Sequence, residues 1–312
     1  MTKKNTFSRR RFLKTAAAAT ALPGLLSTTV WAKPDLKPVP EELLEKIKAA
    51  IPDEATAKPA KPRKILIFCR CEGFPHASIA PCNEAIKMMG ERTGAFDSVV
   101  SQDMAAFDPG KLDEFDAVLF NNTTRLKFED PKRREALMSF VKGGKGIIGI
   151  HAATDNFYNW PEAAEMMGGV FDGHPWGGGG TWAFQIEEPD HPINKGFAGK
   201  GFLAKEEVYK IRAPYTRERS RILVGLDMTN KRNKKGRPDN DNAVSWIHPF
   251  GDGRVFYCSL GHNNEIFCTP EIMQHYLDGI QYALGDLKAD DTPSAKLGKK
   301  VEVVPCPENP EE

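Results

Sequence analysis

The sequence carries almost no net charge. Its 312 residues include 43 lysines and arginines against 42 aspartates and glutamates. Without a basic excess, nothing in the composition points to nucleic acid as a partner. The locally basic stretch 230–241 is interpreted as a solvated loop.

Long apolar runs are also scarce. The stretch 15–26 near the N-terminus is mildly apolar but shorter than the ~20 residues that a membrane-spanning helix needs. No second apolar run follows it, so we expect no stable membrane span.

A C-x-x-C motif is missing as well, which excludes the spacing typical of zinc ribbons and thioredoxin-like redox sites. We expect the cysteines to serve as small buried side chains. One pair, Cys258 with Cys268, is retained as a candidate disulfide. The six cysteines are Cys69, Cys71, Cys82, Cys258, Cys268 and Cys306.

The N-terminus has the three parts of an export signal. Ser8–Lys14 (SRRRFLK) resembles a twin-arginine motif, the apolar stretch follows it, and Val30–Ala32 (VWA) offers a small-residue cleavage site. Residues 1–32 are therefore interpreted as a twin-arginine signal peptide. We expect a mature protein that is exported folded to the periplasm or another extracytoplasmic compartment.

The rest of the chain divides by composition. Residues 33–63 are predicted to form one amphipathic helix, at 39–51, followed by a flexible linker rich in proline, alanine and lysine. Residues 64–287 are long enough for one α/β domain. Residues 288–312 have no apolar period and are predicted to be a loose tail.

Buried strands and helices alternate through the first half of the domain. Strands are expected at 64–70, 115–124 and 146–150, and helices at 81–92, 130–144 and 162–171. Further strands are expected beyond residue 171, including one at 208–213, before a last helix at 269–286. This order predicts an α/β fold with a mostly parallel, doubly wound sheet that is covered by helices on both faces.

Ligands in such sheets bind beyond the carboxyl ends of the strands. Four predicted strands lead into polar residues at that edge: His76, Asn122 with Thr123, His151, and His262. A single histidine at a strand end is more often structural than functional, but the convergence of several favours a site. His174 lies beside glycines that let the backbone approach a ligand. His191, His248 and His275 are interpreted as structural.

Several short motifs occur in a specific order. They include GFPHASI (73–79), GIIGIHAATDNFYNWP (146–161), GGVFDGHP (168–175), EEVY (206–209) and GRVFYCSLGH (253–262). Together they resemble the trehalose-utilisation, ThuA-like family over residues 64–285. The resemblance implies a class I glutamine amidotransferase-like fold, which is a flavodoxin-like three-layer sandwich. It also implies a link to sugar catabolism that involves 3-keto-glucosides.

The resemblance also implies which polar positions matter. They are His76, His151, Asp155, His174, Glu207 and His262. True amidotransferases have a cysteine nucleophile at the turn where this chain has His151, so glutamine hydrolysis is excluded. The chain departs from the family pattern at the glycine-rich stretch 176–180, and at Cys69 and Cys71.

Histidines with a carboxylate suit two kinds of chemistry. Neutral imidazoles can hold a zinc-like divalent ion that polarises a carbonyl, and an imidazole–carboxylate pair can transfer protons. The candidate metal ligands are His76, His151, His174 and His262. The candidate catalytic residues are His151, Asp155 and Glu207. The candidate substrate-binding residues are Asn122, Thr123, Tyr158, Trp160 and Trp176, and for the three aromatic residues packing in the core is an equal alternative.

Three functions remain open from the sequence. The first is an enzyme that acts on a keto-sugar or glycoside, whether as isomerase, lyase or hydrolase. The second is a non-catalytic carbohydrate-binding or accessory protein. The third is a partner-binding module in which residues 33–63 dock onto another protein. The expected partners are a small carbohydrate and either a second copy of the chain or other exported sugar-catabolic proteins.

Overall fold

The computed structural model describes residues 36–233 and 235–308, together with Met1. The predicted signal peptide falls almost entirely outside these residues. Among the residues that are described, no helix has both the length and the apolar character needed to cross a membrane.

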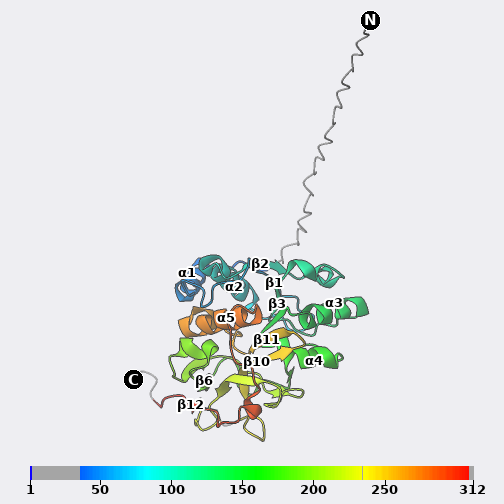
Figure 1. The fold of residues 1–312 in the computed structure, drawn as a ribbon. Coiled ribbons are helices and arrows are strands. Elements are labelled where there is room, and N and C mark those ends of the chain that lie inside the picture. The colour runs from blue at the N-terminus through cyan, green and yellow to red at the C-terminus, as the bar shows by residue number, and fades with distance from the viewer. Residues whose placement is uncertain (2–35, 234, 309–312) are drawn as a thin grey trace. The chain divides into compact units, whose positions relative to one another are not determined.

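Within the described residues, ten strands form one mixed sheet (Figure 1). One half of the sheet is parallel, in the order β2–β1–β3–β4–β11. Its strands are β1 (Lys64–Phe68), β2 (Asp97–Ser101), β3 (Ala117–Asn121), β4 (Gly146–Ile150) and β11 (Gly253–Cys258). Because these strands are parallel, their carboxyl ends meet at one edge of the sheet.

The other half of the sheet is antiparallel and continues from β11 through β10, β9 and β6. β7 and β12 both pair with β6. The bounds are β6 (Thr181–Glu187), β7 (Phe202–Lys205), β9 (Arg221–Leu226), β10 (Ala243–Phe250) and β12 (Val303–Val304). A separate ribbon is formed by β5 (Val170–Phe171) and β8 (Ile211–Arg212).

Helices pack on both faces of the sheet (Figure 1). The helices are α1 (Glu41–Ala50), α2 (Ile79–Thr93), α3 (Pro131–Lys142), α4 (Pro161–Met167) and α5 (Pro270–Ala283). One hydrophobic core joins α1, α2 and α5 to one face, and a second joins α3 and α4 to the other. Alternate residues of β1 enter different cores, with Ile65 in the first and Leu66 in the second, as the pleat of a strand requires.

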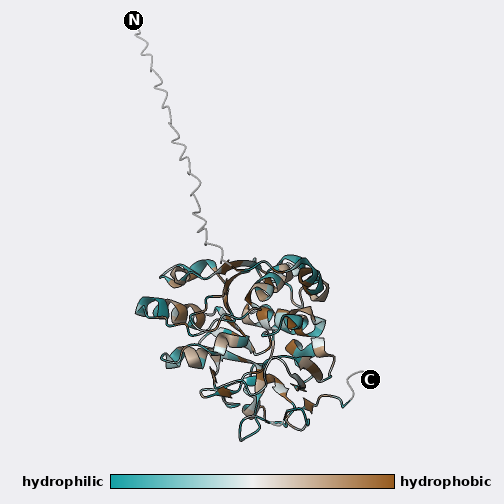
Figure 2. Cartoon of the chain, turned by 180° about the vertical axis from the view of Figure 1, so that it is seen from behind, coloured by the Kyte–Doolittle hydropathy of each residue, from teal (hydrophilic) through white to brown (hydrophobic). Residues whose placement is uncertain are grey.

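The helices are amphipathic, and each carries both hydrophilic and hydrophobic residues (Figure 2). The two ends of α3 carry the residue types from which the helix was predicted. The side chain of Asp130 accepts a hydrogen bond from the N–H of Lys132, Pro131 occupies the first turn, and Gly143 follows the last residue.

The α/β class is confirmed, and a strand forms within each of the ranges 64–70, 115–124 and 146–150, although the first two are shorter than expected. Strand β2 has no counterpart among the predicted strands, because this half-exposed segment (DSVVS) lacks an apolar run. The helix expected at 162–171 ends at Met167. Of the strand expected at 208–213, only Ile211–Arg212 forms.

The description of residues 288–312 as a loose tail is wrong for the part that the structure describes. Val303 and Val304 pair with β6, and Asp291 accepts a hydrogen bond from the hydroxyl of Tyr282 at 2.7 Å. The Ser294 hydroxyl accepts the N–H of Ile222 at 2.9 Å. The sequence analysis missed these contacts because polar groups make them, and a hydrophobic period does not record such groups.

Residues 52–63 are not a free linker either. The N–H of Ala57 donates to the side chain of Gln281 at 3.0 Å, and Arg63 forms an ion pair with Asp286 at 2.6 Å. Before this segment, Ile47 of α1 and Ile51, which directly follows the helix, are buried in the core with α2 and α5. The apolar face that would dock onto another protein is therefore already covered by the chain's own domain.

The candidate disulfide between Cys258 and Cys268 is not formed. All six cysteines belong to the described residues, and all six are free thiols. Cys258 is buried at the end of β11, as expected for a small apolar side chain.

Candidate functional site

Three histidine rings meet at the carboxyl edge of the parallel strands. His151 follows β4, His262 follows β11, and His76 lies in the loop after β1. The ring centroid of His76 is 4.9 Å from that of His151 and 5.4 Å from that of His262. The structure therefore brings together residues that are nearly 200 positions apart, as the strand-end pattern predicted.

His151 lies in a constrained turn. Its φ is +47°, in the left-handed region that side-chain-bearing residues rarely adopt, and its side chain is fully buried. The hydroxyl of Tyr257 donates to the carbonyl of His151 at 2.7 Å and holds this turn in place. A strained, buried and polar residue at a strand end is typical of a functional site.

The hydrogen bonds of His151 determine its tautomer. Its Nδ1 lies 2.8 Å from the carbonyl oxygen of Ser259, which can only accept, so Nδ1 carries the hydrogen. Burial lowers the pKa of His151 well below its usual value, so the ring is neutral. The remaining lone pair is on Nε2, which has no hydrogen-bond partner.

Glu207 lies opposite this lone pair. Its Oε1 is 3.8 Å from His151 Nε2, and its Oε2 is 3.3 Å from His174 Nδ1 and 3.9 Å from His262 Nε2. A carboxylate oxygen and an imidazole lone pair repel each other unless a cation lies between them. The arrangement therefore attracts a proton or a metal ion.

His76 supplies a further neutral imidazole. Burial and, to a lesser extent, the neighbouring His262 and His174 lower its pKa to about 4. Its Nδ1 is buried without a partner, and its Nε2 is 3.5 Å from the hydroxyl of Tyr209. His76 thus keeps an electron pair available near neutral pH.

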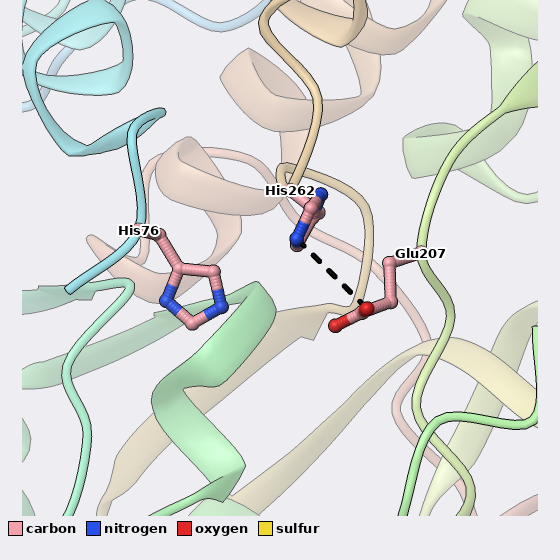
Figure 3. Close-up of side chains that lie close together, drawn as sticks. All are labelled: His76, Glu207 and His262. Atoms are coloured by element: carbon pink, nitrogen blue, oxygen red, sulfur yellow. Dashed lines mark ion pairs between the residues drawn. The ribbon is translucent and has the colours of Figure 1, made fainter. Parts of the chain in front are cut away.

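Three of these side chains have the donor types of a metal site. Ligand atoms of His76, Glu207 and His262 all lie within 4.8 Å of one another (Figure 3). Donors around a tetrahedral zinc ion, each about 2 Å from it, are roughly 3.3 Å apart. Shifts of about an ångström would therefore bring the three atoms to coordinating distance.

His174 is the most exposed histidine of the group. Its side chain is 54% exposed and lies 3.3 Å from Glu207. Close to it in sequence, Gly178 approaches His262, where a Cβ would be 2.9 Å from the ring. The side chain of Asn263 donates to the carbonyl of Gly178 at 2.8 Å, so this part of the glycine-rich stretch is fixed against the site.

Asp155 does not pair with His151, although the sequence analysis grouped them. Both nitrogens of His151 are directed elsewhere, and Asp155 instead accepts from the hydroxyl of Tyr158 and from Arg125 Nε at 3.1 Å. Burial raises the pKa of Asp155 in spite of these two partners. We assign it to the surroundings of the site.

Asn122 and Thr123 are both fully buried. The hydroxyl of Thr123 accepts from the side-chain amide of Asn156 at 2.8 Å, which is a structural role. The amide nitrogen of Asn122 donates to Asn121 at 2.9 Å, while its Oδ1 has no partner. Asn122 therefore has a free acceptor and Thr123 does not.

Of the aromatic candidates, two are core residues. Trp160 packs in an aromatic cluster with Phe128 and Phe157, and Trp176 is 1% exposed. Neither leaves a ring face open to a sugar, which contradicts their assignment to substrate binding. Tyr158 is half-buried, and its ring is stacked beneath the guanidinium of Arg125 at 4.7 Å. The sequence left core packing open for these residues, because an aromatic residue near a motif looks the same in a core and in a site.

Three residues at the site were not identified from the sequence. Glu206 has no exposed surface and accepts the N–H of His262 at 2.7 Å. Tyr209 packs against His151, with ring centroids 4.4 Å apart. Phe74 packs edge to face with His76 at 5.0 Å. Glu206 and Tyr209 lie in the EEVY motif, and Phe74 lies two residues before His76. Their closeness in sequence to recognised motifs is the signal that could have identified them.

Comparison with known proteins points to the family that the sequence motifs resemble. The family model described as ThuA, trehalose utilisation, matches residues 64–283. The fold is similar to that of a ThuA-like protein from Bacteroides uniformis, with a TM-score of 0.60 and 22% identity over 76% of this chain and 98% of that one. It is also similar to a ThuA-like protein from Parabacteroides merdae, with a TM-score of 0.54 and 18% identity over 74% and 93% of the two chains.

No curated protein matches the chain at a significant level. The two structural similarities, both at low identity, support the fold alone. The family model covers most of the chain, including His76, His151, Glu207 and His262. The protein therefore belongs to the ThuA family, which is linked to trehalose utilisation.

Proposed function

We propose that this protein is an exported enzyme that modifies a keto-sugar or glycoside at a zinc-like metal site. The metal ligands are His76, Glu207 and His262, and His151 is the adjacent proton acceptor. The main support is that ligand atoms of His76, Glu207 and His262 lie within 4.8 Å of one another. The neutral Nε2 of His151 lies 3.8 Å from the same carboxylate with no hydrogen-bond partner, so its lone pair is free to accept a proton.

The donor set fits a borderline divalent ion. Two imidazoles and one carboxylate are a common zinc combination, and three protein ligands leave a position open for substrate. When bound, the ion polarises a sugar carbonyl. This role moves Glu207 from acid–base catalysis to metal binding, because its two oxygens lie between 3.3 and 3.9 Å from ring nitrogens of three histidines.

His151 then acts as the base. Its Nε2 carries a lone pair, and its Nδ1–H is held by Ser259, so the imidazole is oriented for proton transfer. On a keto-sugar it would take the proton from the hydroxyl-bearing carbon next to the carbonyl, which leaves an enediolate. Movement of the hydroxyl proton to the former carbonyl oxygen, and return of the carbon proton from His151 to the former carbonyl carbon, would complete an isomerisation.

The alternative is a non-catalytic carbohydrate-binding protein. It is less well supported, because binding an uncharged sugar does not require several neutral imidazoles around a carboxylate.

Export by the twin-arginine route is part of the proposal. It predicts a mature N-terminus near Lys33, which mass spectrometry of periplasmic protein would identify.

The test of the site is elemental analysis of the purified mature protein and three variants. We expect about one zinc or similar ion per wild-type chain, and a large loss in Glu207→Gln and His262→Ala. His191→Gln is the control, because His191 contacts the carbonyl of Asp290 in a turn outside the cluster. Wild-type protein free of metal after growth in metal-replete medium would exclude the metal site.

The catalytic role of His151 needs a separate measurement. His151→Ala and wild type would be incubated with 3-keto-trehalose, and the products followed by NMR. Turnover by wild type, with loss of turnover but not of binding in the variant, supports catalysis. Binding without turnover by wild type would favour the carbohydrate-binding alternative.

A further inference from the structure

We propose that Phe74 is the platform on which a sugar ring of the substrate lies, and that this subsite takes an uncharged pyranose. The inference rests on the proposed function, because it places the substrate next to His76. It assigns a role to a residue that neither proton transfer nor metal binding uses.

Phe74 is unusual in its exposure. Its side chain is 65% exposed, and it is the one aromatic residue among the exposed large hydrophobic residues of the described chain. Burying a phenylalanine side chain is favourable, because it removes apolar surface from water. An exposed phenylalanine beside a cluster of polar groups is therefore available to a ligand.

The exposure does not come from a loosely held loop. The N–H groups of Glu72 and Gly73 donate to the carbonyl of Thr124 at 2.8 and 3.2 Å. The hydroxyl of Thr124 donates to the carbonyl of Phe74 at 3.0 Å. A Cβ on Gly73 would lie 2.5 Å from Arg125 Cγ, so glycine allows this close contact. The backbone thus holds the ring at a fixed place.

The Phe74 ring lies next to one of the candidate metal ligands. Phe74 and His76 pack edge to face, with centroids 5.0 Å apart and an interplanar angle of 80°. The His76 ring is in turn 5.4 Å from that of His262. A sugar ring on Phe74 would therefore extend toward the groups that we propose to carry out the chemistry.

The charges around Phe74 favour a neutral ligand. Arg70 pairs with Glu72 at 2.9 Å, and Arg125 pairs with Asp155 at 3.1 Å. Because each cation already has a carboxylate partner, these residues offer hydrogen bonds rather than an uncompensated charge. The negative face of an aromatic ring attracts the weakly positive C–H groups on one side of a pyranose. An uncharged glycoside fits better than a sugar phosphate.

The test measures by calorimetry the affinity of the protein for trehalose, 3-keto-trehalose and trehalose 6-phosphate. Its readout is binding and not turnover. We expect Phe74→Ala to weaken the best uncharged sugar about tenfold, and Phe74→Trp to restore the affinity. Metal content and thermal stability should not change, since the side chain is exposed. Val303→Ala is the matched control, because Val303 is exposed and lies on β12.

Three outcomes would overturn the proposal. They are unchanged sugar affinity in Phe74→Ala, failure of wild type to bind any of the three sugars, and tighter binding of the phosphate than of both uncharged sugars. A change of oligomeric state in Phe74→Ala with unchanged sugar binding would assign the residue to a protein contact. Because binding is measured directly, failure of the metal or catalytic proposal leaves this result interpretable.

Discussion

The side-chain carboxyl group of Glu206 accepts the backbone N–H of His262 at 2.7 Å. It also accepts the N–H of Glu207 at 3.0 Å and that of Asn263 at 3.1 Å. One buried side chain therefore holds the backbone of two candidate metal ligands from different parts of the chain. Burial raises the pKa of Glu206 to about 8, although these N–H groups lower it in part.

Replacing Glu206 by alanine should weaken both stability and metal binding. The change leaves three part-buried N–H groups without this acceptor, and a buried group left unsatisfied costs about 1–3 kcal/mol. We expect urea unfolding to show a loss of about 3 kcal/mol and a competition assay to show at least tenfold weaker zinc binding. Glu206→Gln should be intermediate, because it keeps one oxygen. Glu265→Ala, at an exposed position nearby, is the control. Wild-type zinc affinity in Glu206→Ala would contradict this positioning role.

His275 should make stability depend on pH below neutrality. Its Nε2 is 2.8 Å from the Ser245 hydroxyl and its Nδ1 is 2.9 Å from the carbonyl of Ile193, both inside the core. Burial lowers its pKa to about 4. An unfolded histidine takes up a proton near pH 6.5. Between these values the unfolded state binds more protons, so the contribution of His275 is complete above about pH 6.5 and falls as the pH decreases.

The measurement compares wild type with His275→Gln at about pH 7 and about pH 5. The slope is about 1.4 kcal/mol per pH unit, so the destabilisation caused by the variant should be about 2 kcal/mol smaller at the lower pH. Other buried groups, such as Asp278 with its pKa raised to about 6, are common to both proteins and cancel in the difference. A pH-independent difference would show that His275 is not held neutral.

The C-terminal segment should contribute to stability through Ser294. Its hydroxyl accepts the buried N–H of Ile222 in β9 at 2.9 Å. Ser294→Ala removes this acceptor and should lower the free energy of unfolding by about 1–3 kcal/mol. Lys296→Ala, two residues further on at an exposed position, should have little effect. Equal stability of the two variants would indicate that the segment is not docked in solution.

Four of the six cysteines, all but Cys71 and Cys268, should behave as buried thiols. Cys258 is fully buried, and burial raises its pKa to about 12. A raised pKa suppresses the reactive thiolate. We expect slow labelling of these four cysteines in the folded protein by a thiol reagent, and labelling of six cysteines after denaturation without reductant. Only four labelled thiols would indicate one disulfide, for which Cys258 and Cys268 would be tested first.

The sequence by itself determined the parallel half of the fold except for its edge strand β2. Strands such as β4 are buried on both faces and read as short apolar runs, and α3 is bounded by Asp130 and Gly143. The rule that ligands bind at the carboxyl ends of parallel strands then placed His76, His151 and His262 at one edge. These features depend on local pattern and on one general property of parallel sheets.

Only the tertiary structure decided how the polar groups pair. The sequence offered both Asp155 and Glu207 as partners for His151, and the packing directs the lone pair of His151 to Glu207 while Asp155 meets Arg125. It likewise buried Trp160 and Trp176 and left Phe74 exposed. Which polar groups pair, and which aromatic side chains are exposed, depends on how segments remote in the chain pack together. The residue types and spacing within one segment do not record that packing.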